Sequence, residues 1–370
     1  HVVIANPPYM GNRNMNGRLG AWLKDNYEDV KSDLFSAFIV RNTEMTLPKG
    51  QLGFMSPFVW MFISSYEKLR SFLINQKTIT SLVQLEYSGF DGATVPICTF
   101  TVENAHRPDY KGGYVKLSDF RGSENQGPKT REAIQSPNCG WFYRASSSDF
   151  KKVPGMPIAF WLSDNLRNAF DKYQGIGHYS SASNGVQTGN NDRFVRNWHE
   201  VSVRSDDLDT WVPYNKGGEF RKWYGNNHYY VNWANDGEEI KSQTNSCIRG
   251  EEYYFKPGIT RSDITSAKSS FRAFDSGHLF DAKGPSAFFK PELINTALGY
   301  LNSNLVYIFS KTLNPTLSFQ IGDFRNLPFN PVVQGVDSPV EELIRVARID
   351  WDSSEISWDF SSLPLLNPDY

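Results

Sequence analysis

The stretch that decides the fold opens the sequence: His1-Val2-Val3-Ile4-Ala5-Asn6-Pro7-Pro8-Tyr9. Residues 2–5 are apolar and mostly β-branched, which predicts a short buried strand. The two prolines lack an N–H, so a stiff turn is expected directly after that strand. In open α/β sheets, ligands bind at the carboxyl ends of the strands. The turn at residues 6–9 is therefore the first candidate for a functional site.

The chemistry of this turn suits an exocyclic amine. Asn6 offers an amide oxygen, Pro7 and Pro8 offer bare carbonyl acceptors, and Tyr9 offers a flat face. The amino nitrogen of adenine is a poor nucleophile, because its lone pair is delocalised into the ring. Two acceptors directed at its hydrogens favour attack on a methyl group and stabilise the developing positive charge. The alternative interpretation is an ordinary proline turn that ends a strand.

The first hundred residues alternate in the manner of an α/β protein. Strand, helix, strand, helix, strand and strand are expected over residues 2–5, 33–46, 52–55, 64–74, 79–85 and 95–102. This order predicts the second half of a Rossmann-like doubly wound sheet, followed by a mixed α+β region. Residues 1–105 are thus expected to form one half of a domain whose first half is absent, and we expect the sequence to be a fragment.

The remainder divides by composition. Residues 106–150 are rich in Gly, Ser, Asn and Pro and are expected to form a loop-rich insertion or linker. Short aromatic strands and turns are expected through residues 151–330, and residues 331–370 are expected to begin a C-terminal spacer. Residues 336–370 carry eight acids and two bases, a net charge of −6, whereas residues 1–335 carry +4. A nucleic-acid surface is thus allowed but not required.

The turn also resembles a known motif. Asn6-Pro7-Pro8-Tyr9 resembles the catalytic motif of amino-group DNA methyltransferases, and residues 33–35 and 53–57 resemble pieces that follow it in that family. The resemblance implies that Asn6, Pro7 and Tyr9 are catalytic. It also implies that Tyr9 and Phe90 stack on the two faces of an adenine flipped out of the duplex. For Phe90, a simple core position is the alternative.

The methyl donor implied by the resemblance is S-adenosyl-L-methionine. In this family it sits on a glycine-rich loop after the first strand, upstream of the catalytic motif. The sequence contains no comparable loop, because Gly112-Gly113 and Gly217-Gly218 lack a strand-to-helix setting. The cofactor-binding residues are therefore unknown. The 370-residue polypeptide is expected to be inactive on its own.

The tail carries a more specific resemblance. Residues 350–360, Asp-Trp-Asp-Ser-Ser-Glu-Ile-Ser-Trp-Asp-Phe, resemble a stretch typical of the PglX family, the adenine-specific DNA methyltransferases of BREX phage-defence systems. The resemblance spans the whole chain but only about the middle third of a typical member. It implies double-stranded DNA and other BREX proteins as partners, and methylation that marks host DNA as self. A cytoplasmic location is expected separately, because three widely spaced cysteines are typical of a reducing compartment. The oligomeric state stays open.

Small polar and basic residues in the second half are candidates for DNA recognition. Residues 185–194 resemble the opening of a target-recognition domain, and an aromatic block with interleaved bases follows, so residues 151–330 are expected to be the DNA target-recognition domain. The candidates for DNA contact are Thr188, Asn190, Asn191, Arg193, Lys216, Arg221 and Lys222. Solvated surface charges and ordinary turns are the alternatives. A rival function is a non-catalytic DNA-recognition subunit, which would not need Asn6 and Tyr9.

Other classes of protein fit the sequence less well. Cys98, Cys139 and Cys247 are far apart, which indicates neither a disulfide framework nor a zinc ribbon. The longest apolar stretch is too short to span a bilayer, and no histidine spacing suggests a metal site. A third possibility is a metal-dependent nuclease, for which an E-x-K triplet with an upstream aspartate is a loose pattern. Glu239-Ile240-Lys241, with Asp209 upstream, fits that pattern, but a charged turn is the favoured interpretation.

Overall fold

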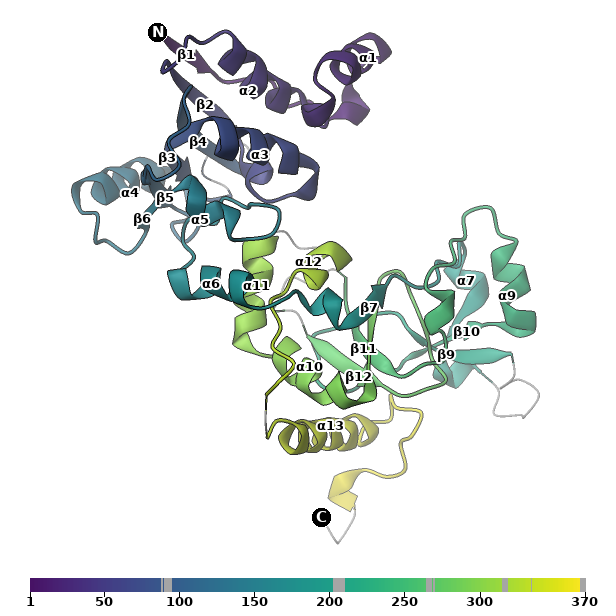
Figure 1. Cartoon of the computed structure of the whole chain (residues 1–370). Coiled ribbons are helices and arrows are strands. Elements are labelled where there is room, and N and C mark those ends of the chain that lie inside the picture. Colours follow the sequence, from purple (N-terminus) through teal and green to yellow (C-terminus); the bar gives the residue numbers. More distant parts are fainter. Residues whose placement is uncertain are drawn as a thin grey trace. The chain divides into compact units, whose positions relative to one another are not determined.

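The chain forms two compact units, His1–Lys172 and Tyr173–Tyr370 (Figure 1). The computed structural model describes residues 1–87, 89, 95–201, 210–263, 268, 270–314, 319–333 and 335–366. The boundary between the units falls inside the segment 151–330 that was expected to be the recognition domain.

A six-stranded mixed sheet is the centre of the first unit. Its strands lie in the order β1-β2-β4-β3-β5-β6, with β1 parallel to β2, β3 parallel to β5, and antiparallel pairs elsewhere. The strands are β1 (Val2–Ala5), β2 (Gln51–Pro57), β3 (Thr78–Gln84), β4 (Ile97–Glu103), β5 (Gly112–Lys116) and β6 (Phe142–Ala145). The order β1-helix-β2-helix-β3-β4 confirms the alternation expected from the sequence, and the α/β class with it.

Helices lie on both faces of this sheet, because neighbouring residues of β3 and β5 point alternately into a large core and into a smaller core that includes Ala133. Long helices follow β1 and β2, and their apolar sides join Leu52, Phe54 and Phe100 in one buried core. The α-helices of the unit are α1 (Gly17–Asn26), α2 (Leu34–Glu44), α3 (Glu67–Gln76), α4 (Ser123–Gln135), α5 (Ser147–Lys151) and α6 (Asp164–Lys172). Single 3₁₀ turns connect them at η1 (Asn12–Asn14), η2 (Glu28–Val30), η3 (Phe58–Met61) and η4 (Ser64–Tyr66).

The other face of the sheet is open at β1. Val2 is 65% exposed and Ile4 is 82% exposed, so the prediction that this strand is buried is wrong for the chain as it stands. The physical reason is position: β1 is the edge strand, and its pairing with β2 places Ile4 beside Gly53, which offers it no side chain. Apolar parallel strands are normally covered on both faces.

The segment 106–150 is more regular than its composition suggests. It contains β5 and β6, which extend the sheet, and α4 and α5, rather than loops alone. Val115, Leu117 and Ala133 form a small separate core there. Its two strands are only five and four residues long, so the Gly, Ser and Asn residues around them dominate the composition and the strands are not evident from the sequence.

Two four-stranded sheets form the second unit. One has the order β13-β9-β10-β8 and the other β12-β11-β14-β7. The strands are β7 (Ser180–Ser183), β8 (Val195–Asn197), β9 (Trp211–Asn215), β10 (Tyr229–Asn232), β11 (Gly258–Arg261), β12 (Phe271–Phe274), β13 (Leu279–Phe280) and β14 (Ser286–Phe289). Aromatic side chains dominate the core between them, as Phe274, Phe280 and Phe288 show.

Helices and single turns connect these strands. The α-helices are α7 (Asn191–Phe194), α9 (Ala234–Lys241), α10 (Ile294–Leu301), α11 (Asn304–Leu313), α12 (Ile321–Arg325) and α13 (Asp337–Asp352). The 3₁₀ turns are η5 (Ile176–His178), η6 (Trp198–Glu200), η7 (Glu251–Tyr253), η8 (Pro291–Leu293) and η9 (Pro364–Leu366).

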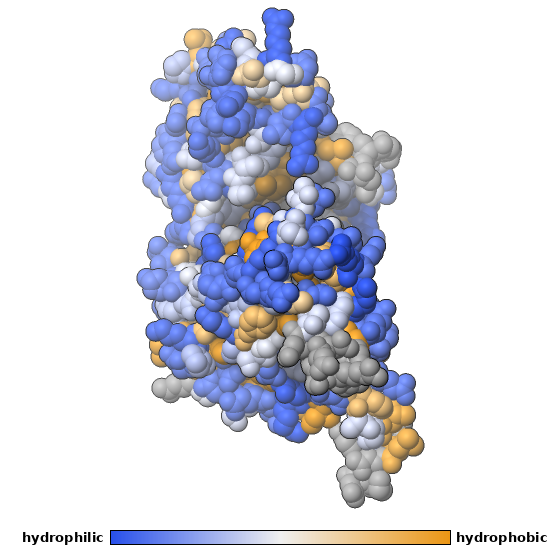
Figure 2. Space-filling view, turned by 90° about the vertical axis from the view of Figure 1, so that its right-hand side faces the viewer, coloured by the Kyte–Doolittle hydropathy of each residue, from blue (hydrophilic) through white to orange (hydrophobic). Residues whose placement is uncertain are grey.

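On the face shown in Figure 2, hydrophobic residues form small groups among hydrophilic ones. None of the helices in the described ranges combines the length and the apolarity needed to cross a membrane.

Candidate active site

The Asn6–Tyr9 turn lies where β1 ends, as the sequence predicts. Pro7 is buried, whereas Asn6 and Pro8 are exposed and Tyr9 is 39% exposed. The Tyr9 hydroxyl donates a hydrogen bond to the Asn6 Oδ1 atom over 3.1 Å. The turn therefore presents an amide oxygen and an aromatic ring side by side at the surface, with one proline anchored below.

Asp33 holds the chain that leaves this turn. Its Oδ1 atom accepts hydrogen bonds from the backbone N–H of Met10 at 2.9 Å and of Phe35 at 3.2 Å. The first bond fixes the end of the turn, and the second caps the N-terminus of α2. The Leu34 N–H returns a bond to the Met10 carbonyl over 3.0 Å. One carboxylate thus couples the turn to a helix whose apolar side is in the core.

Aromatic packing supports Tyr9 from below. The Tyr9 ring meets the ring of Phe35 edge to face, with centroids 6.4 Å apart, and Phe35 packs on the buried Tyr66 at 5.5 Å. Partial burial raises the pKa of Tyr9, and the nearby Cys98 raises it further. Burial also raises the pKa of the Cys98 thiol to about 12. At neutral pH both groups are protonated, so Tyr9 is a hydrogen-bond donor toward Asn6.

The second stacking residue expected from the sequence, Phe90, lies outside the described residues. Its role against a flipped base stays a prediction. Sequence reasoning recognised residues 33–35 as the start of a helix but missed the second bond of Asp33. The available signal was an aspartate directly before an apolar helix, which is a typical N-cap.

Four of the recognition candidates lie together in the second unit. The Asn190 side chain accepts from the Arg193 N–H at 3.1 Å, and the buried Thr188 hydroxyl donates to the Asn191 side-chain oxygen at 2.8 Å. Arg193 forms an ion pair with Glu239 and lies 5.3 Å from the ring of Phe194. These four candidates are neighbours in the sequence, and their side chains mainly form hydrogen bonds and ion pairs around the N-terminus of α7.

The other three candidates also have partners within the unit. Lys216 lies over the ring of Tyr229 at 5.1 Å. Arg221 forms an ion pair with Asp350 at 2.7 Å and stacks on Trp351 at 5.0 Å. Lys222 donates to a backbone carbonyl over 2.7 Å, and burial lowers the pKa of its ammonium group. Contact of these residues with DNA stays a prediction.

The E-x-K triplet, Glu239-Ile240-Lys241, lies at the C-terminal end of α9, so it is helical and not the turn expected from the sequence. Its charged side chains pair with neighbouring residues. Glu239 pairs with Arg193, and Lys241 pairs with Asp236 at 2.8 Å and with Glu251 at 2.5 Å. Asp209 lies outside the described residues. Within the part of the chain that the structure describes, no three His, Cys, Asp or Glu side chains gather in a way that could hold a metal ion.

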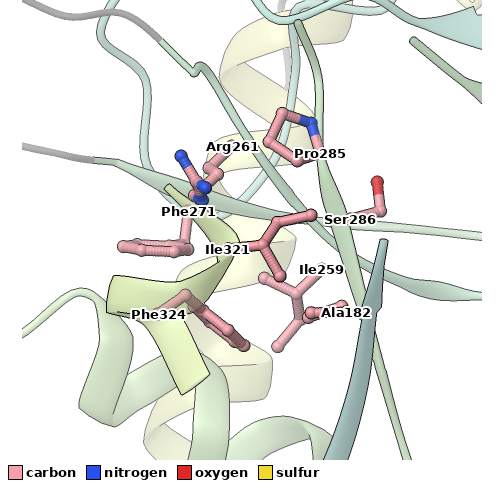
Figure 3. Close-up of a pocket in the computed structure, with 9 residues that line it drawn as sticks. Ala182, Ile259, Arg261, Phe271, Pro285, Ser286, Ile321 and Phe324 are labelled. Atoms are coloured by element: carbon pink, nitrogen blue, oxygen red, sulfur yellow. The ribbon is translucent and has the colours of Figure 1, made fainter. Parts of the chain in front are cut away.

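A small pocket lies between the second sheet of this unit and α12 (Figure 3). Apolar side chains such as Ile259, Phe271 and Phe324 line it beside the Arg261 guanidinium. Arg261 lies over the ring of Phe319 at 4.9 Å, and burial lowers its pKa to about 10. The pocket has room for about one water molecule, so it does not fit a nucleotide.

Part of the first unit matches a known protein family. A model of the Eco57I restriction-modification methylase family matches residues 1–90, the segment that contains β1, the Asn6–Tyr9 turn and α2. The type II restriction enzyme and methyltransferase RM.Eco57I of Escherichia coli is 23% identical over 52% of the chain and 19% of its own length.

Two curated relatives match almost the whole chain. The adenine-specific methyltransferase PglX of Lacticaseibacillus casei (strain Zhang) is 36% identical over 99% of the chain. The adenine-specific methyltransferase BrxX of Escherichia coli O9:H4 (strain HS) is 34% identical over 99% of it. The chain spans 32% and 30% of their lengths, about one third. The resemblance that the tail indicated is thereby confirmed.

Solved structures share the fold. The type IIL restriction-modification enzyme MmeI, determined in complex with DNA, superposes with a TM-score of 0.55 at 12% identity, covering 100% of this chain and 51% of its own. The type ISP enzyme LlaGI, determined with a DNA substrate mimic, gives 0.52 at 13% identity over 95% of this chain and 35% of its own. Both show a likeness of fold alone.

Proposed function

We propose that this chain, whose sequence resembles PglX and BrxX along nearly its full length, forms part of an adenine-specific DNA methyltransferase and presents the target base to the methyl donor. The observation that carries the proposal is the geometry of one turn. Asn6 and Tyr9 lie side by side at the carboxyl end of β1, and Asp33 ties the turn to α2. This is the edge of a sheet at which α/β enzymes bind their substrates.

The chemistry follows from the hydrogen-bonding capacity of the turn. The Asn6 Oδ1 atom accepts from Tyr9 in the free protein, and its second lone pair stays available for the adenine amino group. A backbone carbonyl of the two prolines is the second acceptor. Together they stabilise the positive charge that grows on the nitrogen as it attacks. Tyr9 stacks on one face of the base, and Phe90 on the other. Direct displacement then depends mainly on positioning.

The methyl donor, S-adenosyl-L-methionine, needs residues that this chain does not show. β1 is the edge strand of the sheet, so no described strand lies beyond it to carry a glycine-rich turn. The residues described here do not make a cofactor pocket, and none is assigned to one. We propose that the rest of the full-length protein pairs with β1, covers Val2 and Ile4, and thereby completes a doubly wound sheet.

DNA is the macromolecular substrate that this account requires. A base reaches a surface turn such as Asn6–Tyr9 only after it has left the duplex. We propose that the second unit takes part in selecting the site on double-stranded DNA, within a cytoplasmic BREX-type defence system whose other proteins act with the methyltransferase. Base-reading residues are not assigned, because each recognition candidate already has a partner within its unit.

The direct test is methyl transfer by the full-length protein. Wild type, Asn6→Ala and Asn75→Ala are each incubated with radiolabelled S-adenosyl-L-methionine and duplex DNA. Asn75 is an exposed asparagine on α3 and serves as the matched control. We expect Asn6→Ala to lose about 100-fold or more in rate while it keeps its affinity for DNA, and Asn75→Ala to equal wild type.

A second candidate function is a DNA-recognition subunit without its own chemistry. It is favoured by the size of the second unit, which has a core rich in aromatic side chains and contains all the recognition candidates. Equal methylation by wild type and Asn6→Ala would support this candidate and contradict the catalytic role.

A further inference from the structure

The segment that follows the turn has an unusual charge. The first acidic residue of the chain is Asp25, and the residues before it include three bases, Arg13, Arg18 and Lys24. This local charge of +3 lies within fifteen residues of Tyr9, in a chain whose net charge is −2. We call residues 11–24 the basic segment; it consists of η1, its flanking residues and the first eight residues of α1.

The basic segment is fixed beside the turn. The Asn12 N–H donates to the Ser32 carbonyl over 3.1 Å, directly next to the bonds of Asp33. Asn16 caps α1 by accepting from the Leu19 N–H at 2.9 Å. Leu19 packs against the core, and Leu23 is fully buried within it. The other side of α1 therefore stays at the surface at a defined position, and Figure 1 shows this helix in dark purple at the margin of its unit.

Two arginines of the segment are exposed without a counter-ion. Neither the Arg13 nor the Arg18 side chain forms an ion pair or a hydrogen bond with any residue that the structure describes. This differs from Lys31 and Lys68 nearby, which pair with Glu28 and Asp29 at 2.5 Å. Exposed cations that are held on a rigid element and lack an internal partner are well suited to bind an anionic ligand.

The exposed side of α1 also carries an aromatic ring. Arg18 and Trp22 are four residues apart, so they lie on the same side of the helix. Trp22 is 49% exposed, and its ring rests on Tyr27 with centroids 5.5 Å apart. A guanidinium next to a large exposed ring is a combination that suits nucleic acid, where phosphates and apolar sugar and base surfaces alternate.

We propose that Arg13 and Arg18 bind the backbone phosphates that flank the extruded adenine. This inference rests on the proposed function, because it assumes that a base occupies the Asn6–Tyr9 turn. Arg13 lies four positions after Tyr9, a span of at most about 14 Å, so it lies within reach of the strand whose base the turn holds. Arg18 lies five positions further along, in the first turn of α1, and it contacts the next part of that strand. An extruded nucleotide keeps its backbone connections, and contacts to its phosphates position the strand without reading sequence.

The experiment measures DNA binding by the full-length protein as a function of salt. The Arg13→Gln/Arg18→Gln double variant is compared with wild type and with Lys49→Gln. Lys49 is an exposed cation in the turn before β2, at the opposite end of the sheet from Asn6. The probes are one duplex with the methylated sequence and one with that sequence altered.

We expect the dissociation constant of the double variant to rise on the order of tenfold on both duplexes. The slope of log K against log salt should fall by nearly two, about 0.9 for each lost phosphate contact. Lys49→Gln should bind as wild type does. A double variant with the affinity and salt slope of Lys49→Gln would overturn the inference, as would a loss confined to the methylated sequence.

The same samples separate this inference from the proposed function. If wild type methylates DNA and Asn6→Ala does not, while the double variant binds normally, only the role of the two arginines fails. If wild type and Asn6→Ala methylate equally, the proposed function fails whatever the salt slope. Far-UV circular dichroism of the double variant checks that α1 still folds. We expect an unchanged spectrum, because both arginines are exposed and support no buried contact.

Discussion

At the scale of single residues, Asp33 is the link between the core and the Asn6–Tyr9 turn. Its carboxylate caps α2 and also fixes the Met10 N–H, so one side chain stabilises a helix and positions a loop. Asp33→Ala should cost about 1 kcal/mol of stability through the lost cap. It should also lower kcat for methyl transfer more than that loss explains, because the turn is released.

Asp33→Asn provides the matched control for this prediction. The amide oxygen of asparagine accepts the same hydrogen bonds, so both stability and kcat should recover most of the loss. Thermal unfolding and steady-state kinetics of the full-length protein measure the two effects. An Asp33→Ala variant with normal kcat would show that the turn does not depend on this bond.

Asp281 carries a pH dependence of the second unit. Its carboxyl lies 2.6 Å from the Tyr214 hydroxyl, and burial raises the pKa of Asp281 above its usual value. An acid with a raised pKa favours the folded state most fully at low pH, and this contribution is lost as pH rises through the folded pKa. An Asp281→Asn variant replaces the carboxyl by an amide, which does not titrate.

We therefore expect the melting temperature of Asp281→Asn, relative to wild type, to be higher at about pH 7 than at about pH 4. Thermal unfolding at the two pH values measures this difference. If the melting-temperature difference between Asp281→Asn and wild type is the same at both pH values, or is larger at about pH 4, the carboxyl does not titrate with a raised pKa.

At the scale of elements, the tail packs as part of the second unit. Trp351 of α13 is 3% exposed and meets the ring of His228 with centroids 4.9 Å apart, while Trp358 meets Trp198 at 5.8 Å. The Trp198 indole N–H donates to the Ile356 carbonyl over 2.7 Å. The sequence predicts the start of a spacer here, because composition shows no contact between distant residues.

Trp351→Ala should destabilise this unit by about 3–5 kcal/mol, the range for removing a large buried aromatic side chain. Leu343→Ala on the same helix is the control, because Leu343 is 40% exposed and its loss should matter far less. Chemical denaturation followed by far-UV circular dichroism compares the two. Equal and small effects would mean that α13 is only loosely attached.

The elements also show why some features escaped prediction. The alternation over β1 to β4 was predicted because each element has a clear apolar period. The Asn6–Tyr9 turn was predicted because a strand followed by two prolines is a local signal. The ion pair of Arg221 joins residues 129 positions apart, and no local pattern indicates such a partner. Sequence therefore identified Arg221 as a cation but not what it binds.

At the scale of the whole molecule, the sheet of the first unit is open at its β1 edge. Val2 and Ile4 are exposed on an edge strand, although β1 carries the proposed catalytic turn. We expect the 370-residue polypeptide to transfer no methyl group from radiolabelled S-adenosyl-L-methionine to DNA, whereas the full-length protein does. Activity of the polypeptide at a rate near that of the full-length protein would show that it holds a complete cofactor site.

The central claim is that Asn6 acts directly in adenine methylation. Modified-base sequencing of DNA from cells that carry the full-length gene, compared with cells that carry the Asn6→Ala version, tests it most directly. We predict methyladenine at one asymmetric sequence in the first genome and its absence from the second. An identical methylation pattern in both genomes would contradict the claim.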